Sequence, residues 1–138
     1  MSIEVKVNFD INKIKKDILD KQKDILERAM VESATGIVQR TRARQDANGD
    51  SFIALSPKYR KYKTSKGRQG VPDLTFSGRM LASIASKVTQ ESIGQLVGRI
   101  FFNSSKEAAK ARGNQRLRKF FALSADQINR IKSLLRGF

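Results

Sequence analysis

The sequence predicts a single α+β domain in which a small antiparallel sheet packs against a long N-terminal helix, with short helices and a C-terminal helix. Residues 3–9 alternate apolar and polar side chains, as a half-buried strand does. Residues 11–44 repeat apolar side chains every three or four positions, which is the period of an amphipathic helix. Residues 86–103 contain two more strand patterns around a turn. Because 138 residues is the size of one ordinary domain, we expect one core spanning 1–138.

The first strand leads directly into the long helix. The apolar side chains of the strand share one face: Ile3, Val5, Val7 and Phe9. Asp10 can cap the helix, and Ile14 is placed to pack on Phe9 across that cap.

The predicted helix over about 11–44 is roughly 50 Å long at 1.5 Å per residue. Its apolar stripe comprises Ile11, Ile14, Ile18, Ile25, Leu26, Ala29, Met30, Ile37 and Val38. Gly36 is a candidate for a kink or an earlier end, since glycine weakens a helix interior. A helix this long in so small a domain is expected to project from it or to pack along neighbours in an assembly.

Residues 45–76 form a basic region that we expect to be mostly loop. At its start, Asp46, Asn48 and Asp50 have the spacing of a calcium-binding loop. The twelfth position of that loop is Pro57, where calcium requires a bidentate glutamate, so we interpret the segment as a turn. Further on, Ser56 and Pro57 can begin a short helix through Tyr59 and Tyr62.

Residues 77–138 contain a short helix, a hairpin and the C-terminal helix. Ser77 is a plausible cap for one or two helical turns that carry Met80, Leu81 and Ile84. The hairpin is expected to turn near Glu91 and Ser92.

The second strand of this hairpin places Leu96, Ile100 and Phe102 on one face. Gly98 within it indicates a bulge or a close approach of another part of the chain. Residues 104–119 suggest a short helix and a connection.

The C-terminal helix has the clearest local signals. Ser124 and Gln127 form a capping box. An apolar stripe follows, at Ile128, Ile131, Leu134 and Leu135.

The net charge of +15 favours polyanionic partners, either nucleic acid or an acidic protein surface. Basic residues concentrate in two segments that are the candidate contacts. These are Lys58, Arg60, Lys61, Lys63, Lys66 and Arg68 in the first, and Lys106, Lys110, Arg112, Arg116, Arg118 and Lys119 in the second. Such residues bind phosphates without reading sequence, and the same clusters are also typical of plain solvated surfaces.

The residue types for catalysis are sparse. Histidine and cysteine are absent, which removes the commonest general base, the thiolate nucleophile and the usual transition-metal ligands. No phosphate-binding glycine motif occurs. We expect no enzyme activity, no cofactor and no metal.

The location expected from the sequence is the cytoplasm of the cell that makes the protein. Its N-terminus lacks the pattern of a signal peptide. No apolar segment approaches the roughly 20 residues that cross a bilayer, so we expect no membrane association.

An ordered set of short motifs resembles the tail-completion, or virion morphogenesis, family of tailed bacteriophages. NGDSF, ALSPKY, a lysine run to KG, and DLTFSGRML followed by ASI occur in that order, and RKFFALSADQINRI closes the set. The resemblance covers roughly residues 45–136. Position by position it falls on Phe52, Leu55, Ser56, Tyr59, Lys63, Asp73, Leu74, Ser77, Gly78, Met80, Leu81 and Ser83, then on Phe120, Phe121, Leu123 and Ser124.

This resemblance implies a structural protein of the phage neck or tail end, made in the host cytoplasm and incorporated into the virion. It implies a homo-oligomeric ring, possibly a hexamer, that docks on neighbouring neck or tail proteins, with no catalytic site and no cofactor. Most motif residues are expected to be architectural, and the basic residues to contact partners. The alternative is a basic DNA-binding protein without sequence specificity.

The chain departs from the family pattern at two places. Ser77 stands where relatives often have threonine, which keeps a capping hydroxyl. The relatives often have a proline before the aromatic residue, where this chain has QRLRKF, so the shape of 113–119 is open.

Overall fold

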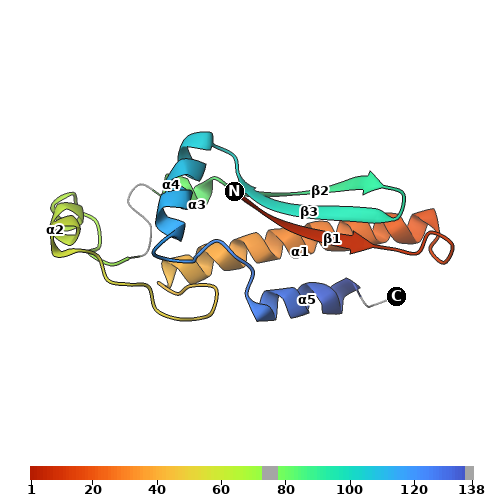
Figure 1. Ribbon diagram of the computed structural model, residues 1–138, viewed down its shortest axis with the longest axis horizontal. Helices are drawn as coiled ribbons and strands as arrows, with labels where there is room; N and C mark the ends of the chain where they lie inside the picture. The colour runs from red at the N-terminus through yellow and green to blue at the C-terminus, as the bar shows by residue number, and fades with distance from the viewer. Residues whose placement is uncertain (73–77, 136–138) are drawn as a thin grey trace.

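The computed structural model describes residues 1–72 and 78–135 and confirms the α+β class. One antiparallel sheet of three strands, in the order β1-β3-β2, is combined with helices (Figure 1). The elements are β1 (Ser2–Asn8), α1 (Lys16–Arg42), α2 (Pro57–Ser65), α3 (Arg79–Ala82), β2 (Ile84–Ser92), β3 (Gln95–Phe102), α4 (Ser105–Gln115) and α5 (Ala125–Leu135).

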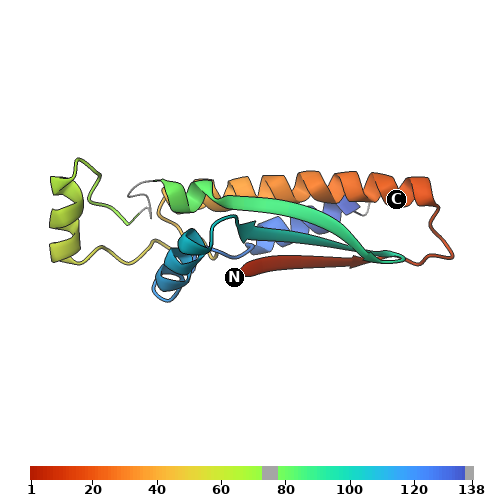
Figure 2. The ribbon, with the colours of Figure 1, turned by 90° about the horizontal axis from the view of Figure 1, so that it is seen from above.

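The body has two layers, because α1 and α5 lie side by side against one face of the sheet (Figures 1 and 2). The expected packing of the sheet against the long helix is therefore confirmed. Leu26, Met30 and Ile37 of α1 are fully buried, as are Leu96 and Ile100 of β3. The opposite face of the sheet is covered by none of the described helices (Figure 2).

The long helix is shorter at its N-terminus than predicted. Asp10 does cap a turn, since its carboxylate accepts a hydrogen bond from the backbone N–H of Asn12 at 3.0 Å. That turn stops, and α1 begins only at Lys16, after Lys15, whose side chain makes no capping bond. The helix then runs without a break through Gly36 to Arg42. The predicted start at residue 11 is wrong because Asp10 caps a separate turn.

The hairpin differs from the prediction at both ends. Ile84 is the first residue of β2 rather than part of the preceding helix, which ends at Ala82. The turn lies at Ile93 and Gly94, not at Glu91 and Ser92. Gly94 has φ +78°, a left-handed conformation that glycine adopts without strain, and this fixes the turn there.

Two further local predictions agree with the structure, whereas Ile11 and Ile128, predicted in apolar stripes, are 53% and 40% exposed. Ser124 and Gln127 form the capping box, with N–H to side-chain oxygen distances of 2.9 and 3.1 Å. Asp46 accepts hydrogen bonds from the N–H groups of Asn48 and Asp50, so this segment is the expected turn.

Gly98 marks a close approach rather than a bulge. A Cβ atom there would lie 2.7 Å from Sδ and 2.8 Å from Cγ of Met30, which is fully buried on α1. Gly98→Ala is therefore expected to lower the free energy of unfolding by about 1–3 kcal/mol through overpacking. Gly113→Ala is the control, because no atom lies within 4 Å of its added methyl group and alanine favours a helix. Denaturant unfolding of both variants tests this, and equal stabilities would contradict it.

Candidate functional site

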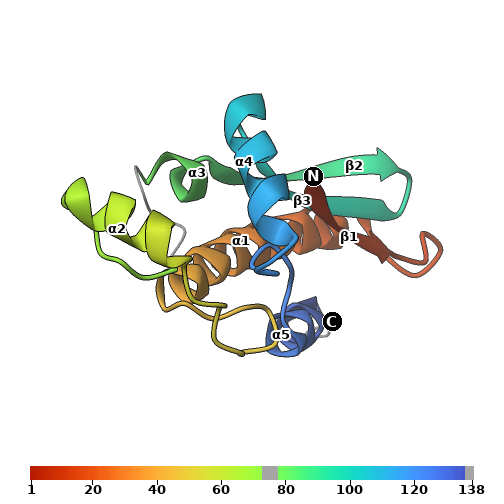
Figure 3. The same ribbon diagram turned by 60° about the vertical axis from the view of Figure 1, so that its left-hand side comes forward.

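A basic arm, residues 56–72, projects from the body and contains α2. It lies beyond the C-terminal end of α1, at the same end of the molecule as α3 and α4 (Figures 1 and 3). Ser56 caps α2 by accepting a hydrogen bond from the N–H of Tyr59 at 3.3 Å, and Pro57 occupies the first turn. The helix start expected from these two residues is confirmed.

The arm holds its own shape at the end of α2. The N–H of Gly67 donates to the carbonyl of Thr64 at 3.0 Å, and that of Arg68 donates to the carbonyl of Lys63 at 3.2 Å. With Gly67 at φ +74°, this is a Schellman motif. The returning chain then packs closely, since a Cβ on Gly70 would lie 2.9 Å from atoms of Arg60 and Thr64.

Lys63 is a structural residue of the arm and not one of its surface contacts. Only 2% of it is exposed, and its ammonium group donates to the carbonyl of Val71 at 2.8 Å. Burial therefore leaves Lys63 little surface for the predicted contact with DNA or a partner.

The rest of the predicted cluster is exposed and lies together on the arm. These residues are Lys58, Arg60, Lys61, Lys66 and Arg68. Two half-exposed tyrosines accompany them, Tyr59 and Tyr62, with ring centroids 6.3 Å apart. The ammonium group of Lys66 lies 5.7 Å from the Tyr62 ring centroid. The arm thus exposes cations and aromatic rings within one short segment of the chain.

The second basic segment also contains both exposed cations and a cation that is bonded to the backbone. Arg112, Arg116 and Lys119 are exposed. Arg118 is half-buried, and its guanidinium group donates to the carbonyl of Ile53 through Nε at 3.2 Å and Nη2 at 3.0 Å. Arg118 therefore holds the chain that leads into the arm, while its predicted contact with DNA or a partner stays a prediction.

A cleft of about 720 Å³ lies where the arm joins the body. Its apolar lining includes Ile53 and Leu117, which are 62% and 63% exposed, together with Leu55 and Met80. Glu107 lies in its wall, nearly buried, and its Oε1 accepts a hydrogen bond from Lys110 at 3.3 Å. Sequence reasoning missed this cleft because its residues come from four separate segments.

The motif residues are mainly architectural where the structure describes them. Phe52, Met80 and Leu81 are buried, Leu55 is half-buried, and Gly78 precedes α3 with φ +80°. Asp73, Leu74 and Ser77 lie outside the described residues.

Phe120 and Phe121 are core residues. They form an aromatic cluster with Phe102, whose ring centroid lies 4.7 Å from that of Phe121 and 6.5 Å from that of Phe120. This second part of the motif joins the end of β3 to the segment before α5.

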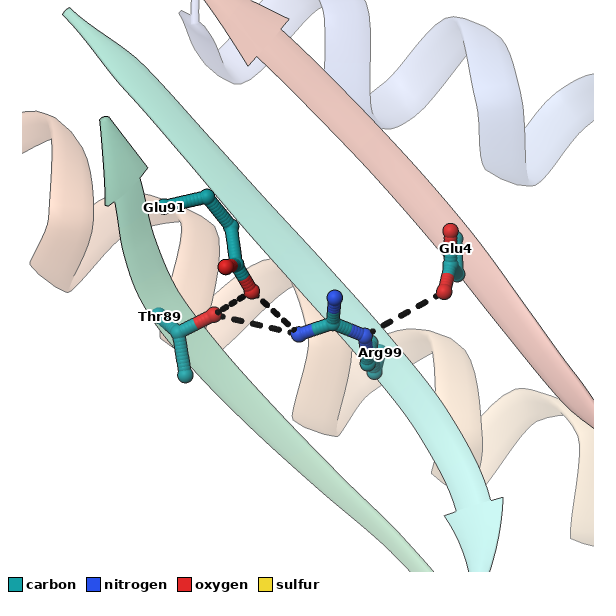
Figure 4. A network of polar contacts seen from close by, with 4 residues as sticks. All are labelled: Glu4, Thr89, Glu91 and Arg99. Carbon is teal, nitrogen blue, oxygen red and sulfur yellow. Dashed lines mark hydrogen bonds and ion pairs between the residues drawn. The ribbon is translucent and has the colours of Figure 1, made fainter. Parts of the chain in front are cut away.

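Arg99 links all three strands on the solvent face of the sheet (Figure 4). Its guanidinium group contacts Glu91 at 2.8 Å, Thr89 at 3.1 Å and Glu4 at 3.3 Å. The pKa of the Glu91 carboxylate is lowered, first by its hydrogen bond from Arg99 and then by that from Thr89. The pKa of Arg99 is raised, first by its hydrogen bond to Glu91 and then by that to Glu4.

This network predicts a pH-dependent contribution to stability. A carboxylate whose pKa is lower in the folded state stabilises the fold above its unfolded pKa of about 4.3, and that contribution is lost as the pH falls through the folded pKa. Wild type should therefore melt at a higher temperature than Arg99→Gln at about pH 7, with the difference disappearing towards about pH 3. Lys87→Gln, on the same face, is the control. A difference that stays constant with pH would contradict the prediction.

The described residues contain no cluster of three or more side chains suited to hold a metal ion. Within 1–72 and 78–135, no helix is both long and apolar enough to span a membrane. Comparison of the chain with protein-family models, with curated proteins and with solved structures finds no match. The candidate site comprises the basic arm and the cleft beside it, with exposed cations, tyrosine rings and apolar side chains.

Proposed function

We propose that this chain is a structural protein of a tailed bacteriophage, a tail-completion or head–tail joining subunit that forms a ring at the neck or tail end of the virion. The motif order in residues 45–136 supports the family. The single observation that carries the proposal is the basic arm, an ordered element whose helix α2 makes few contacts with the other described helices and strands.

The arm is built for contact with something outside the chain. Its cap, its Schellman motif and its buried lysine hold it in shape, as shown above. An ordered projection that buries little surface on its own chain gains its packing on assembly. The partners under this proposal are other copies of the chain and the neighbouring neck or tail proteins.

Electron microscopy of lysates from a phage that lacks the gene tests the proposal. Filled heads beside unjoined or misformed tails are the expected result, and a plasmid copy of the gene should restore joined particles. Normal joined particles without the gene would overturn the assembly role.

A second function, DNA binding without sequence specificity, is favoured by one observation. The five exposed cations of the arm lie beside two tyrosines that can stack on bases. Under this alternative, affinity for duplex DNA falls steeply with salt, with log K changing by about 0.9 per log unit of salt for each phosphate neutralised. Affinity that does not respond to salt would exclude it.

A further inference from the structure

The sheet has two open edges, β1 on one side and β2 on the other. Outside the ladders with β3, no backbone hydrogen bond joins either strand to another part of the described chain. β1 has seven residues and β2 has nine, and neither contains proline. Long open edges of this kind are templates for another strand, and proteins usually block them.

The hydrogen bonds at the strand ends show which backbone groups face outward. The N–H of Phe9 donates to the carbonyl of Gly94, so every second residue from Phe9 back to Ile3 pairs with β3. Glu4 and Lys6 then present their N–H and carbonyl groups to the open edge. On β2, the N–H of Asn103 donates to the carbonyl of Ser83, so every second residue from Ser83 pairs with β3. The residues between them present their N–H and carbonyl groups to the open edge: Ile84, Ser86, Val88 and Gln90.

The core layer is also incomplete beside β1. A groove of about 370 Å³ separates β1 from α5, lined by Val5, Val7, Ile131 and Leu135 among others. Val5 and Val7 remain half-buried in it. Apolar side chains from one more strand, added next to β1, would fill this groove from the open side.

The other open edge has the complementary chemistry. Ile84 and Val88 of β2 lie on the helix-covered face, where they would continue the apolar layer. On the solvent face, Glu4 of β1 and Lys87 of β2 both pair with Arg99 of β3, from opposite sides. Lys6 and Thr89 both pair with Val97 in the same way, and Glu91 lies two residues beyond Thr89 on β2. Glu4 of one edge thus matches Lys87 of the other, and Lys6 lies within one side-chain step of Glu91, although Glu4 and Glu91 also contact Arg99.

We infer that β1 of one copy pairs with β2 of the next, so that the sheet continues from subunit to subunit. β1 and β2 are both antiparallel to β3, so they run in the same direction, and a rotation about an axis along the strands brings them together as a parallel pair. Such a contact joins two different surfaces, and it gives a ring when successive rotations close on the first copy. The inference rests on the proposed function and names the interface that the ring uses.

Paired cysteines test this interface directly, because the chain has no native cysteine. Lys6→Cys is combined in turn with Lys87→Cys, Thr89→Cys or Glu91→Cys, which samples the register of the pairing. Within one copy these positions are two strands apart, roughly 9–10 Å, which is too far for a disulfide. The expected result is covalent multimers of more than two chains for at least one pair under mild oxidation.

The single variants are the matched controls. Lys6→Cys alone, or its β2 partner alone, should stay uncrosslinked. Covalent dimers from Lys6→Cys alone would show β1 paired with β1 about a two-fold axis, and would overturn the head-to-tail arrangement. No crosslinks from any of the three pairs would overturn the inference as well.

A backbone substitution provides a second readout. Lys6→Pro removes an outward N–H while leaving the β1–β3 ladder its donors, and Lys6→Ala removes only the side chain. The proline variant should need about tenfold more protein to assemble than the alanine variant, as measured by sedimentation, with both melting similarly as monomers. If the proline and alanine variants form rings at the same protein concentration as wild type, the edge pairing is refuted and the proposed function stays intact. A wild-type chain that stays monomeric at all concentrations would contradict both.

Discussion

If the proposed function holds, a phage whose copy of this protein carries a neutralised basic arm is expected to accumulate filled heads and separate tails, with infectious titre reduced by orders of magnitude. The variant carries glutamine at four exposed positions of the arm: Lys58, Arg60, Lys61 and Lys66. These residues are exposed, and glutamine keeps the Cγ of Arg60 that lies against Gly70, so the substitution removes charge while keeping the hydrogen bonds that hold the arm in shape. Electron microscopy and plaque counts measure the result.

The matched control removes the same charge from the other end of the molecule. It carries glutamine at four exposed lysines around the start of α1: Lys13, Lys15, Lys16 and Lys21. Both variants lower the net charge equally, so a defect confined to the arm variant assigns the effect to position and not to total charge. Joined, infectious particles from the arm variant would remove the arm from the joining surface.

Salt-titrated DNA binding by the same two proteins identifies the arm's partner. If all four cations contact phosphates, the salt slope of the arm variant should be shallower by about 3–4 than that of wild type. An unchanged slope combined with lost joining indicates that the arm contacts an acidic protein surface instead.

The fold could be predicted because its elements carry strong periodic patterns. The alternation in β1 and the stripe of α1 both survive as burial patterns in the structure. Gly36 illustrates what the pattern could not show. It does not kink α1, and its role is to admit another chain segment, since a Cβ there would lie 2.7 Å from Nε2 of Gln127. Sequence alone cannot reveal a neighbour that is 91 residues away, 127 minus 36.

The sequence could predict which segments of the candidate site are basic, but not which of their side chains are exposed. Charge counts found both basic segments, yet they could not separate Lys63 and Arg118, which bond to backbone carbonyls, from their exposed neighbours. One available signal was overlooked. Gly67 follows a short helical pattern, which is the position of a C-terminal glycine cap, and it indicates that the chain reverses over Lys63.

Arg40 holds the segment from Phe120 to Gln127 against α1. We expect Arg40→Met to lower the stability of the fold strongly. Its guanidinium group donates to the carbonyl oxygens of Phe120 and Ala122 at 2.9 and 2.7 Å, and to Oε1 of Gln127 at 3.0 Å. Gln127 also donates to the carbonyl of Ser33 at 3.0 Å. Burial lowers the pKa of Arg40, against an opposing contribution from Asp46.

Methionine keeps the apolar stem of Arg40 and leaves these acceptors without their donor. Two carbonyls and an amide oxygen in a half-buried place each cost free energy, so we expect a loss of about 2–4 kcal/mol in the free energy of unfolding. For a domain of this size that corresponds to a fall in Tm of roughly 10 °C. Hydrogen exchange should show α5 losing protection before the sheet does, because its capping residue Gln127 is released from Arg40.

Arg42→Met is the matched control, since Arg42 belongs to the same last turn of α1 but is exposed. It should change Tm by no more than a few degrees, as surface substitutions do. Arg40→Lys separates charge from shape: one ammonium group cannot reach three acceptors as a fork does, so it should recover only part of the loss. Equal melting temperatures for Arg40→Met and Arg42→Met would show that α5 and the Phe120–Ala122 segment are held by apolar packing alone.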